Sequence, residues 1–418
     1  MSPLIQIIHG EFWERGIPEC TKRETTILES PGKISSIIGM RRSGKTYLMF
    51  DRIRDLIKNN IKPEQILYLN LEDDRLEIKN SKELGSLIDS FFELFPDNFK
   101  RPVFLFLDEI QEISSWEKVA RRFLDSKNVS IWITGSSATL LSKELATGLR
   151  GRAIITETYP FSFKEWLTHT KENVLLKKIR GPAFYATVKK LLRKYLLCGG
   201  FPEVSLVEEF KRVRILQDYK ELVIMKDIVE RHRIHNLGVM NALISTIISS
   251  ASCSISINKI FNDFKSRGLT LGKDTLYEYM KFLEDAYFSF SVRIHTDSNR
   301  KREVNPFKSY LIDPGMITAC KQTSSEDIGR LFENLIFLDL KRSGYNLSYN
   351  LSEEGHEVDF VALNSISKKV ILIQACWDSS NVMTFNREQR ALDEAKKKFK
   401  CKALLVTPDS YLDFIELL

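Results

Sequence analysis

A glycine-containing loop follows the first strand-like run of the sequence and constrains the fold more than any other feature. Residues 33–38 favour a β-strand and lead into Gly39-Met-Arg-Arg-Ser-Gly-Lys-Thr46, a complete GxxxxGK[ST] pattern. The two glycines permit backbone angles and close approaches that other residues block, so the loop N–H groups can surround phosphate oxygens at a helix N-terminus. Apolar residues between 48 and 57 suit the following helix. A strand before the loop and a helix after it favour nucleotide binding over a chance match.

The eight residues of the loop are therefore the expected nucleotide-binding residues: Gly39, Met40, Arg41, Arg42, Ser43, Gly44, Lys45 and Thr46. In such a loop the lysine contacts the β- and γ-phosphates, and the Ser or Thr hydroxyl ligates Mg²⁺. We therefore expect ATP and Mg²⁺ as cofactors. The absence of a guanine-reading Asn-Lys-x-Asp motif favours ATP over GTP.

A pair of carboxylates follows the most apolar strand of this region. Strands are expected at 65–71 and 103–107, and the second ends in Asp108-Glu109. We assign Asp108 to the Mg²⁺ site and Glu109 the role of the catalytic base that polarises the attacking water. Acidic residues are common after strands, so the pair gains its weight from the phosphate-binding loop that precedes it.

Two further strands carry candidate residues at their ends. The strand at 129–134 leads to Ser136 and Ser137, and Ser136 either caps the next helix or senses the γ-phosphate. One serine can do both. Arg152 precedes a strand at 153–158 and is a candidate arginine finger, in its own site or in a neighbour's. A solvated arginine is the alternative, and it is the preferred interpretation for Arg150.

This order of elements resembles that of the AAA-type ATPases. The stretches 134–137, 160–165 and 199–203 (Thr-Gly-Ser-Ser, Pro-Phe-Ser-Phe-Lys-Glu and Gly-Gly-Phe-Pro-Glu) are similar to prokaryotic ATP-binding proteins that join an AAA-type module to a C-terminal part of unknown function. The resemblance covers nearly the whole chain. It implies an α/β fold with a parallel P-loop sheet, a helical lid and ATP hydrolysis.

The positive charge of the chain is concentrated in one segment. The chain has 62 Lys and Arg against 55 Asp and Glu, a formal charge of +7. Residues 151–200 hold 10 of the basic and 3 of the acidic side chains, so the other residues balance. A basic amphipathic helix at 180–197 is the expected lid, where part of the charge would face ATP phosphates. Net charge is therefore weak support for nucleic-acid binding.

The sequence predicts a cytoplasmic protein without membrane contact. No run approaches the ~18–20 apolar residues of a membrane span, and the N-terminus lacks the cationic and apolar regions of a signal peptide. The six cysteines are scattered, with no CxxC pair and no nearby histidine in metal-ligand spacing. We therefore expect reduced cysteines and no structural zinc.

Residues 238–312 suggest a winged helix-turn-helix. Helical periodicity appears at 240–249, 256–266 and 273–285, and strand-like segments at 287–294 and 309–312 flank a polar loop. This loop holds Arg300, Lys301 and Arg302, a candidate wing tip for phosphate contacts. The third helix has few side chains suited to reading bases. The alternative is a winged helix used only for protein packing.

The last hundred residues resemble the restriction-endonuclease-like fold, whose pattern is Glu…Asp…(Glu or Gln)-x-Lys. Glu333, Asp359 and Gln374 match the pattern, but Cys376 stands at the lysine position and a thiol supplies no cation. Lys368 and Lys369 lie at the opposite end of the strand. The expected domain is a degenerate, non-catalytic one, and a relocated lysine is the alternative.

The sequence predicts four parts, at residues 1–165 (AAA-type domain), 166–235 (lid and linker), 236–315 (winged helix) and 325–418 (nuclease-like domain). The predicted function is a Mg²⁺-dependent ATPase that couples its nucleotide state to a C-terminal module that binds DNA or RNA. The alternatives are an ATP-gated nuclease and an ATP-dependent switch that binds a protein partner. A finger acting on a neighbouring site would require an oligomer.

Overall fold

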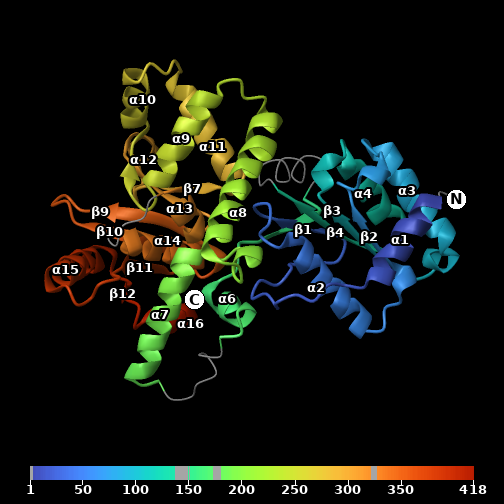
Figure 1. The fold of residues 1–418 in the computed structure, drawn as a ribbon, viewed down its shortest axis with the longest axis horizontal. Coiled ribbons are helices and arrows are strands. Elements are labelled where there is room, and N and C mark those ends of the chain that lie inside the picture. The colour runs from blue at the N-terminus through green and yellow to red at the C-terminus, as the bar shows by residue number, and fades with distance from the viewer. Residues whose placement is uncertain (1–2, 137–148, 150, 173–179, 322–326) are drawn as a thin grey trace. The chain divides into compact units, whose positions relative to one another are not determined.

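The computed structural model describes residues 3–136, 149, 151–172, 180–321 and 327–418 (Figure 1). The chain forms two compact units, Met1–Tyr159 and Pro160–Leu418. The division into four parts predicted from the sequence is finer than these two units and stays a prediction. Ser137 and Arg150 lie outside the described residues.

The first unit is built on a parallel five-stranded sheet. Its strands are β1 (Ile34–Ile38), β2 (Ile66–Asn70), β3 (Val103–Asp108), β4 (Val129–Gly135) and β5 (Ala153–Glu157). They lie in the order β2-β3-β4-β1-β5, and each neighbouring pair is parallel. All five residues of β1 are buried, as expected for a parallel strand with both faces covered. The expected α/β P-loop fold is confirmed for this unit.

Helices complete this unit. They are α1 (Pro3–Arg15), α2 (Lys45–Lys58), α3 (Ser81–Leu94) and α4 (Trp116–Ser126), with short 3₁₀ turns at Pro63–Gln65, Asp74–Leu76, Pro96–Phe99 and Ile110–Glu112. Phe12 of α1 and Phe50 of α2 pack in one apolar cluster with Phe106 of β3 and Trp132 of β4. The Phe106 and Trp132 rings stack with centroids 4.6 Å apart. Because α2 packs on this face, the loop between β1 and α2 is held at the carboxyl edge of the sheet.

The second unit contains two antiparallel or mixed sheets. One has the order β6-β8-β7, with β6 (Ser254–Ile255), β7 (Ser289–Val292) and β8 (Phe307–Leu311). The other has the order β12-β11-β10-β9, with β9 (Tyr345–Leu351), β10 (Glu357–Asn364), β11 (Val370–Ala375) and β12 (Lys402–Val406). Its helices are α6 (Phe163–His169), α7 (Pro182–Cys198), α8 (Glu209–Leu222), α9 (Leu237–Ser249), α10 (Ile257–Ser266), α11 (Lys273–Asp285), α12 (Asn299–Val304), α13 (Pro314–Cys320), α14 (Asp327–Arg342), α15 (Val382–Phe399) and α16 (Tyr411–Leu417). A π-helical segment, Val223–Glu230, continues α8.

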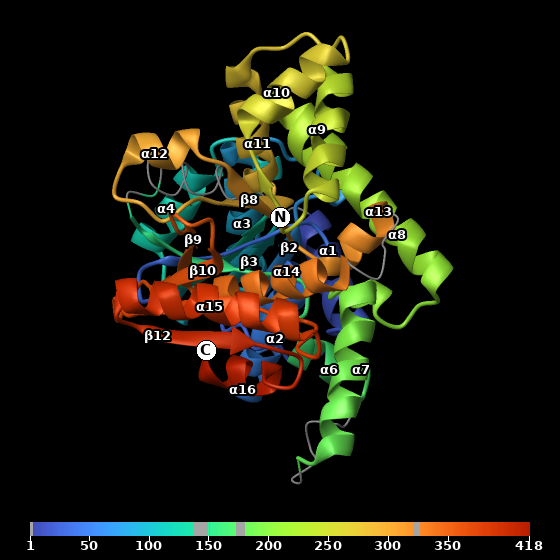
Figure 2. The same ribbon diagram turned by 90° about the vertical axis from the view of Figure 1, so that its left-hand side faces the viewer.

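Helices α14 and α15 cover opposite faces of the four-stranded sheet. Phe360 of β10 packs against Phe337 of α14, whereas Val361 belongs to an apolar cluster with Ala391 and Leu392 of α15. Neighbouring residues of a strand point to opposite faces. Helix α15 runs along β12 in Figure 2, and the two elements are in contact.

The sequence stretches at 160–165 and 199–203 meet in the core of the second unit. Tyr195 of α7 donates a 2.6 Å hydrogen bond to the Phe161 carbonyl, and the Phe161 N–H donates to the Gly200 carbonyl at 2.7 Å. The Gly200 N–H in turn donates to Asp313 Oδ2 at 2.6 Å. A Cβ on Gly199 would lie 2.1 Å from the Asp313 carboxylate. These stretches therefore have a packing role, and α7 packs on α13 and α14 within this unit. A lid role for α7 stays a prediction.

The prediction of a polar loop between β7 and β8 is wrong in part. Residues Asn299–Val304 form the short helix α12, which contains Arg300, Lys301 and Arg302. Its start is explained by Ser298, whose hydroxyl accepts the Lys301 N–H as an N-cap. The three basic side chains therefore project from a helix instead of from a flexible wing tip.

Within the part of the chain that the structure describes, every helix is too short or too polar to span a lipid bilayer.

Candidate nucleotide-binding site

The loop between β1 and α2 has the backbone that its two glycines permit. Gly39 has a φ of 155°, and a Cβ at this position would lie 2.2 Å from the Thr158 carbonyl oxygen. Gly44 has a φ of 99° and is the N-cap of α2. Both conformations disfavour residues with a Cβ. The loop can therefore run close beside the residue that follows β5 and present its N–H groups at the start of α2.

The Lys45 ammonium lies inside this loop. The side chain is buried, and its Nζ donates to the carbonyls of Gly39 at 3.2 Å and Met40 at 3.3 Å. Glu109 Oε1 lies 3.6 Å from the same Nζ. The lysine is thus held at the mouth of the loop, between the backbone that would receive a phosphate and the predicted catalytic base.

The remaining loop residues have distinct surroundings. Arg41 Nη1 forms a 2.8 Å ion pair with Glu72, Arg42 is exposed with a φ of 67°, and Met40 is fully buried. Arg23 was not predicted: its guanidinium donates to the Ser43 carbonyl at 3.0 Å and to the Tyr159 carbonyl at 2.6 Å. Arg23 lies outside any recognisable motif, so no local signal marked it.

The two predicted Mg²⁺ residues contact each other. The Thr46 hydroxyl donates to Asp108 Oδ2 at 2.8 Å, and the Tyr68 hydroxyl donates to the same oxygen at 2.8 Å. Thr134 of β4 donates to Asp108 Oδ1 and accepts the Glu109 N–H at 2.8 Å. Tyr68 and Thr134 were not assigned roles from the sequence. Their position opposite the tip of β3 follows from the strand order.

Burial determines the protonation chemistry of Asp108. The side chain is 3% exposed, and this burial raises its pKa above the ordinary value, although three hydroxyl donors oppose the shift. Thr46 and Asp108 supply a hydroxyl and a carboxylate oxygen, which are the hard donors that Mg²⁺ takes together with water and phosphate oxygens. A buried carboxylate of this kind gains from a nearby cation. The donor set therefore fits Mg²⁺.

Glu109 has the opposite shift. Burial alone would raise its pKa, but the Lys45 charge, the Gln111 hydrogen bond and the Arg41 charge outweigh burial and lower it. Gln111 Nε2 lies 2.6 Å from Glu109 Oε2. The residue has a φ of 54°, an uncommon conformation for a side chain with a Cβ. Glu109 is therefore an ionised carboxylate held beside the loop, as a group that orients and polarises water requires.

Ser136 lies at the same edge of the sheet. It directly follows β4, whose last residue Gly135 pairs with Ile38 of β1, and it is fully buried. This position agrees with both interpretations made from the sequence. The residues that follow lie outside the described part of the chain, so the choice between helix capping and phosphate sensing stays a prediction.

Arg152 lies at the other edge of the sheet. Ile34 pairs with Ala153 in the parallel register, so Arg152 precedes β5 at the amino end, whereas Gly39 follows β1 at the carboxyl end. At ~3.3 Å per residue these two positions are roughly 20 Å apart. The Arg152 guanidinium pairs with Asp125 of α4. A finger role in its own site does not fit this geometry. A role in a neighbouring site stays a prediction.

The structure brings two of the three predicted nuclease-like residues onto a lysine that the sequence did not single out. Lys308 Nζ of β8 lies 2.8 Å from Glu333 Oε1 of α14 and 2.8 Å from Asp359 Oδ1 of β10. The third residue, Gln374, contacts the backbone of Asp359: the Asp359 N–H donates to Gln374 Oε1 at 3.0 Å. Burial and the Asp359 charge raise the pKa of Glu333 to about 7. The signal available in the sequence was Lys308 itself, a charged residue in the otherwise uncharged strand 307–311.

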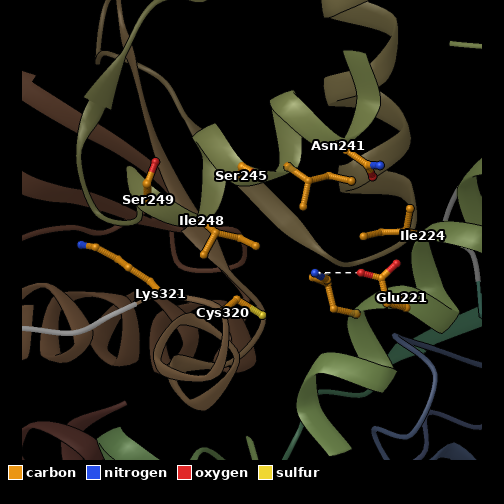
Figure 3. Close-up of a pocket in the computed structure, with 10 residues that line it drawn as sticks. Glu221, Ile224, Asn241, Ser245, Ile248, Ser249, Cys320 and Lys321 are labelled. Atoms are coloured by element: carbon orange, nitrogen blue, oxygen red, sulfur yellow. Dashed lines mark ion pairs between the residues drawn. The ribbon is translucent and has the colours of Figure 1, made fainter. Parts of the chain in front are cut away.

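Two other features of the second unit carry no assignment. A cavity of about 200 Å³ lies between α8, α9 and the end of α13, and Lys220 and Glu221 at its rim form a 2.9 Å ion pair (Figure 3). Its wall mixes apolar and polar side chains without a converging set of donors. Glu354, His356 and Glu394 lie close enough to share a cation, but exposed acidic groups are common without one.

Comparisons with known proteins agree with this geometry. Residues 31–167 match a family described as an AAA domain, and residues 189–327 match a domain of unknown function (DUF8612). An uncharacterized protein of Methanocaldococcus jannaschii is 35% identical over 382 residues, which are 90% of this chain and 82% of that protein. The chain belongs to the same family as this archaeal protein.

A second relative is less similar to this chain. An uncharacterized protein of Haemophilus influenzae is 28% identical over 346 residues, 82% of this chain and 82% of that protein. Among solved structures, the Aeropyrum pernix ORC1 protein in complex with DNA is 11% identical, covers 70% of this chain and 87% of its own, and has a TM-score of 0.32. Cdc6p from Pyrobaculum aerophilum is 12% identical, covers 62% and 80%, and has a TM-score of 0.26. TM-scores this low support no inference about this chain.

Proposed function

We propose that the chain is a Mg²⁺-dependent ATPase whose nucleotide state controls a C-terminal module that binds nucleic acid. The observation that carries the ATPase part is the convergence of four side chains at the carboxyl edge of one sheet. Lys45 Nζ lies 3.6 Å from Glu109, and Thr46 Oγ1 lies 2.8 Å from Asp108. Membership of an AAA-domain family supports the same reading.

Each of these side chains has a separate task in the proposed reaction. The Lys45 ammonium would leave the two loop carbonyls for the β- and γ-phosphate oxygens, and the loop N–H groups would surround the same phosphates. Thr46 and Asp108 would hold Mg²⁺, which balances phosphate charge when bound. Glu109, ionised and positioned by Gln111, would orient the attacking water and accept hydrogen bonding from it.

The lysine supplies the test of binding. Lys45→Ala should abolish ATP binding, measured by titration with a fluorescent ATP analogue, and with it ATP turnover. Lys58→Ala is the matched control, because Lys58 ends the same helix α2 and its side chain is 75% exposed. ATP turnover at the wild-type rate in Lys45→Ala would overturn the proposal.

The glutamate supplies the test of hydrolysis. Glu109→Gln should still bind ATP with Mg²⁺ and hardly hydrolyse it, because the amide keeps the shape but not the charge that polarises water. Glu93→Gln is the matched control, because Glu93 of α3 is exposed and its substitution removes the same charge outside the site. Normal turnover in Glu109→Gln would place the base elsewhere while leaving the nucleotide site intact.

The nucleic-acid part of the proposal is supported by exposed basic side chains between residues 259 and 301 of the second unit. Arg300 and Lys301 project from α12, and further lysines and arginines are exposed on the preceding helices, at Lys259, Lys265, Arg267 and Lys273. Basic side chains on one region supply phosphate contacts without base reading. Binding of nucleic acid through its phosphates agrees with the composition of α11, the third helix of the predicted winged helix, which carries few side chains suited to reading bases.

A further inference from the structure

The second unit contains a buried cation surrounded by carboxylates. The Lys308 side chain is 3% exposed, and its Nζ lies 2.8 Å from Glu333 Oε1, 2.7 Å from Glu357 Oε1 and 2.8 Å from Asp359 Oδ1. Glu357 and Asp359 both reach the ammonium from β10. The pairing of β10 with β9 shifts register between Val358 and Val361, so Asp359 lies on the same face of the sheet as its neighbour Phe360. Glu333 approaches from α14, which packs on that face.

The charge of this ammonium is compensated on three sides by carboxylates. A lysine ammonium has three N–H donors and no acceptor. Two of them donate to Glu333 Oε1 and Asp359 Oδ1 at 2.8 Å, and Glu357 Oε1 forms an ion pair with the same Nζ at 2.7 Å. Three carboxylates around Nζ repel a phosphate oxygen, and the burial of the side chain keeps a phosphodiester away from it. Lys308 is therefore not a relocated catalytic lysine in this arrangement.

The ammonium also occupies the point at which these oxygens converge. A divalent cation bound by the same three oxygens would have to lie at this point, at ~2.0–2.6 Å from each. It cannot share the position with Nζ. The Tyr310 hydroxyl donates to Glu333 Oε1 at 2.6 Å and further satisfies the oxygen that a metal would need. The residues therefore do not fit the metal that the nuclease-like pattern implies.

The contact also joins the two sheets of the unit. Lys308 belongs to the β6-β8-β7 sheet, whereas Asp359 and Glu357 belong to the β12-β11-β10-β9 sheet, and α14 contacts both (Figure 1). The sheets are joined independently by a bridge between Ile294 and Tyr349 and by a 2.7 Å hydrogen bond from Tyr349 to the Pro306 carbonyl. Loss of the ammonium alone thus leaves other contacts in place.

We propose that Lys308 is an internal substitute for a divalent cation, which joins the two sheets of the second unit and leaves the nuclease-like carboxylates without a metal site. The substitution makes this connection independent of metal concentration. It also assigns Glu333, Glu357 and Asp359 a binding role toward a side chain of the same chain. This inference does not depend on ATP hydrolysis by the first unit.

Mn²⁺ is the probe, because free and bound Mn²⁺ are counted directly by electron paramagnetic resonance. The full-length, nucleotide-free chain is used with Asp108→Asn in every sample, so that the proposed cation site of the first unit is silenced. With Lys308 intact, adding Asp359→Asn should not change the number of bound Mn²⁺ ions. With Lys308→Met, one additional Mn²⁺ per chain should bind, and Asp359→Asn should remove it.

Thermal unfolding gives a second readout. Lys308→Met should lower the melting temperature, and Mn²⁺ should raise it again only while Asp359 is present. Lys369→Met is the matched control, because Lys369 is exposed near the start of β11 and should change neither quantity.

Two results would overturn the proposal. One is a Mn²⁺ ion bound with Lys308 intact and lost in Asp359→Asn. The other is a folded Lys308→Met chain that gains no Mn²⁺, since the carboxylates would then form no cation site at all. If Lys308→Met does not fold, the comparison of the Lys308-containing chains with and without Asp359→Asn decides the question alone.

Discussion

The hydroxyl of Thr46 and the carboxylate of Asp108 are joined by a 2.8 Å hydrogen bond, although 62 residues separate them in sequence. Thr46 lies in the first turn of α2, after β1 and its loop, and Asp108 ends β3; β4 runs between β1 and β3. Thr134 of β4 completes the connection, because its hydroxyl donates to Asp108 and accepts the Glu109 N–H. The proposed metal side and the proposed base are thus positioned by one threonine.

Thr134→Val should reduce ATP turnover more than ATP binding. The variant keeps the shape of the side chain but removes the hydrogen bonds to Asp108 and to the Glu109 backbone. Loss of a partner that orients a metal ligand commonly costs about 10- to 100-fold. We expect a fall of this size in kcat, with the affinity for an ATP analogue changed much less.

Thr134→Ser is the control for this prediction, since it restores the hydroxyl without the methyl group and should recover most of the turnover. An equal loss of turnover in the serine and valine variants would show that Thr134 acts through packing alone.

Gly39→Ala should disable the nucleotide site by steric conflict. The new Cβ would lie 2.2 Å from the Thr158 carbonyl, and backbone atoms cannot give way as a flexible side chain does. Overpacking of this kind costs ~1–3 kcal/mol or more. We expect a lower melting temperature and no detectable ATP binding. Gly10→Ala, in helix α1 with no atom within 4 Å of the new Cβ, should be neutral or stabilising. Wild-type ATP affinity in Gly39→Ala would contradict the role of this glycine.

The first unit was largely predictable because its signals are local. The loop 39–46 and the Asp108–Glu109 pair each lie within a few residues of a strand whose apolar pattern is plain. In contrast, the hydrogen bonds of Tyr68, Thr134 and Arg23 join residues that are far apart in the sequence. They depend on the order of the strands in the sheet, which the spacing of residues along the chain does not reveal. Arg152 could have been placed better. A residue that precedes a parallel strand lies at the amino edge, opposite a loop that follows one.

The second unit was predictable in its elements and not in its connections. Helices α7, α9, α10 and α11 were expected within a few residues of their observed bounds, whereas α8, α13 and α16 were not expected. The short helix α12 was also missed, because its Ser298 cap carries little signal in a polar segment. Lys308 and Glu333 are 25 residues apart and belong to different elements. Their ion pair forms only when α14 packs against β8, so a lysine inside an otherwise uncharged strand was the sole indication.

Asp313→Asn should change how stability depends on pH. Burial raises the pKa of Asp313 to about 6, although N–H donors from Gly200 and Met316 oppose the shift. The folded state then holds the proton more tightly than the unfolded state, so this group stabilises the fold at low pH and loses the effect as the pH rises from about 4 to 6, by roughly 3 kcal/mol.

The measurement for Asp313 is the difference in melting temperature between the wild type and Asp313→Asn at pH 4.5 and pH 7. The wild type should lose stability relative to the variant at the higher pH. Asp409→Asn, an exposed substitution with the same change of charge, should show no such trend. A difference that is constant between the two pH values would contradict the assignment.

Arg300→Ala with Lys301→Ala should weaken binding of nucleic acid and lower its salt dependence. On duplex DNA, each lost phosphate contact reduces the slope of log Kobs against log salt by about 0.9, so two contacts remove about 1.8. The slope is measured by fluorescence anisotropy with DNA and RNA, with and without ATP. The double variant Lys368→Ala with Lys369→Ala removes the same charge from an exposed turn and should keep the wild-type slope. A wild-type chain without salt-sensitive binding would favour a protein partner instead.

Mixing two inactive variants should decide the role of Arg152. The guanidinium is bound to Asp125 at the amino edge of the sheet, so within one chain it should contribute little to ATP turnover. If Arg152→Ala nevertheless loses turnover, mixing tests whether the arginine acts on a neighbouring chain. The Arg152→Ala chain has an intact phosphate-binding loop, and the Lys45→Ala chain has an intact arginine. Each supplies what the other lacks, so turnover should return when the two are mixed. A loss that mixing does not repair would trace to the Asp125 pair instead, and Asp125→Ala should then reproduce it.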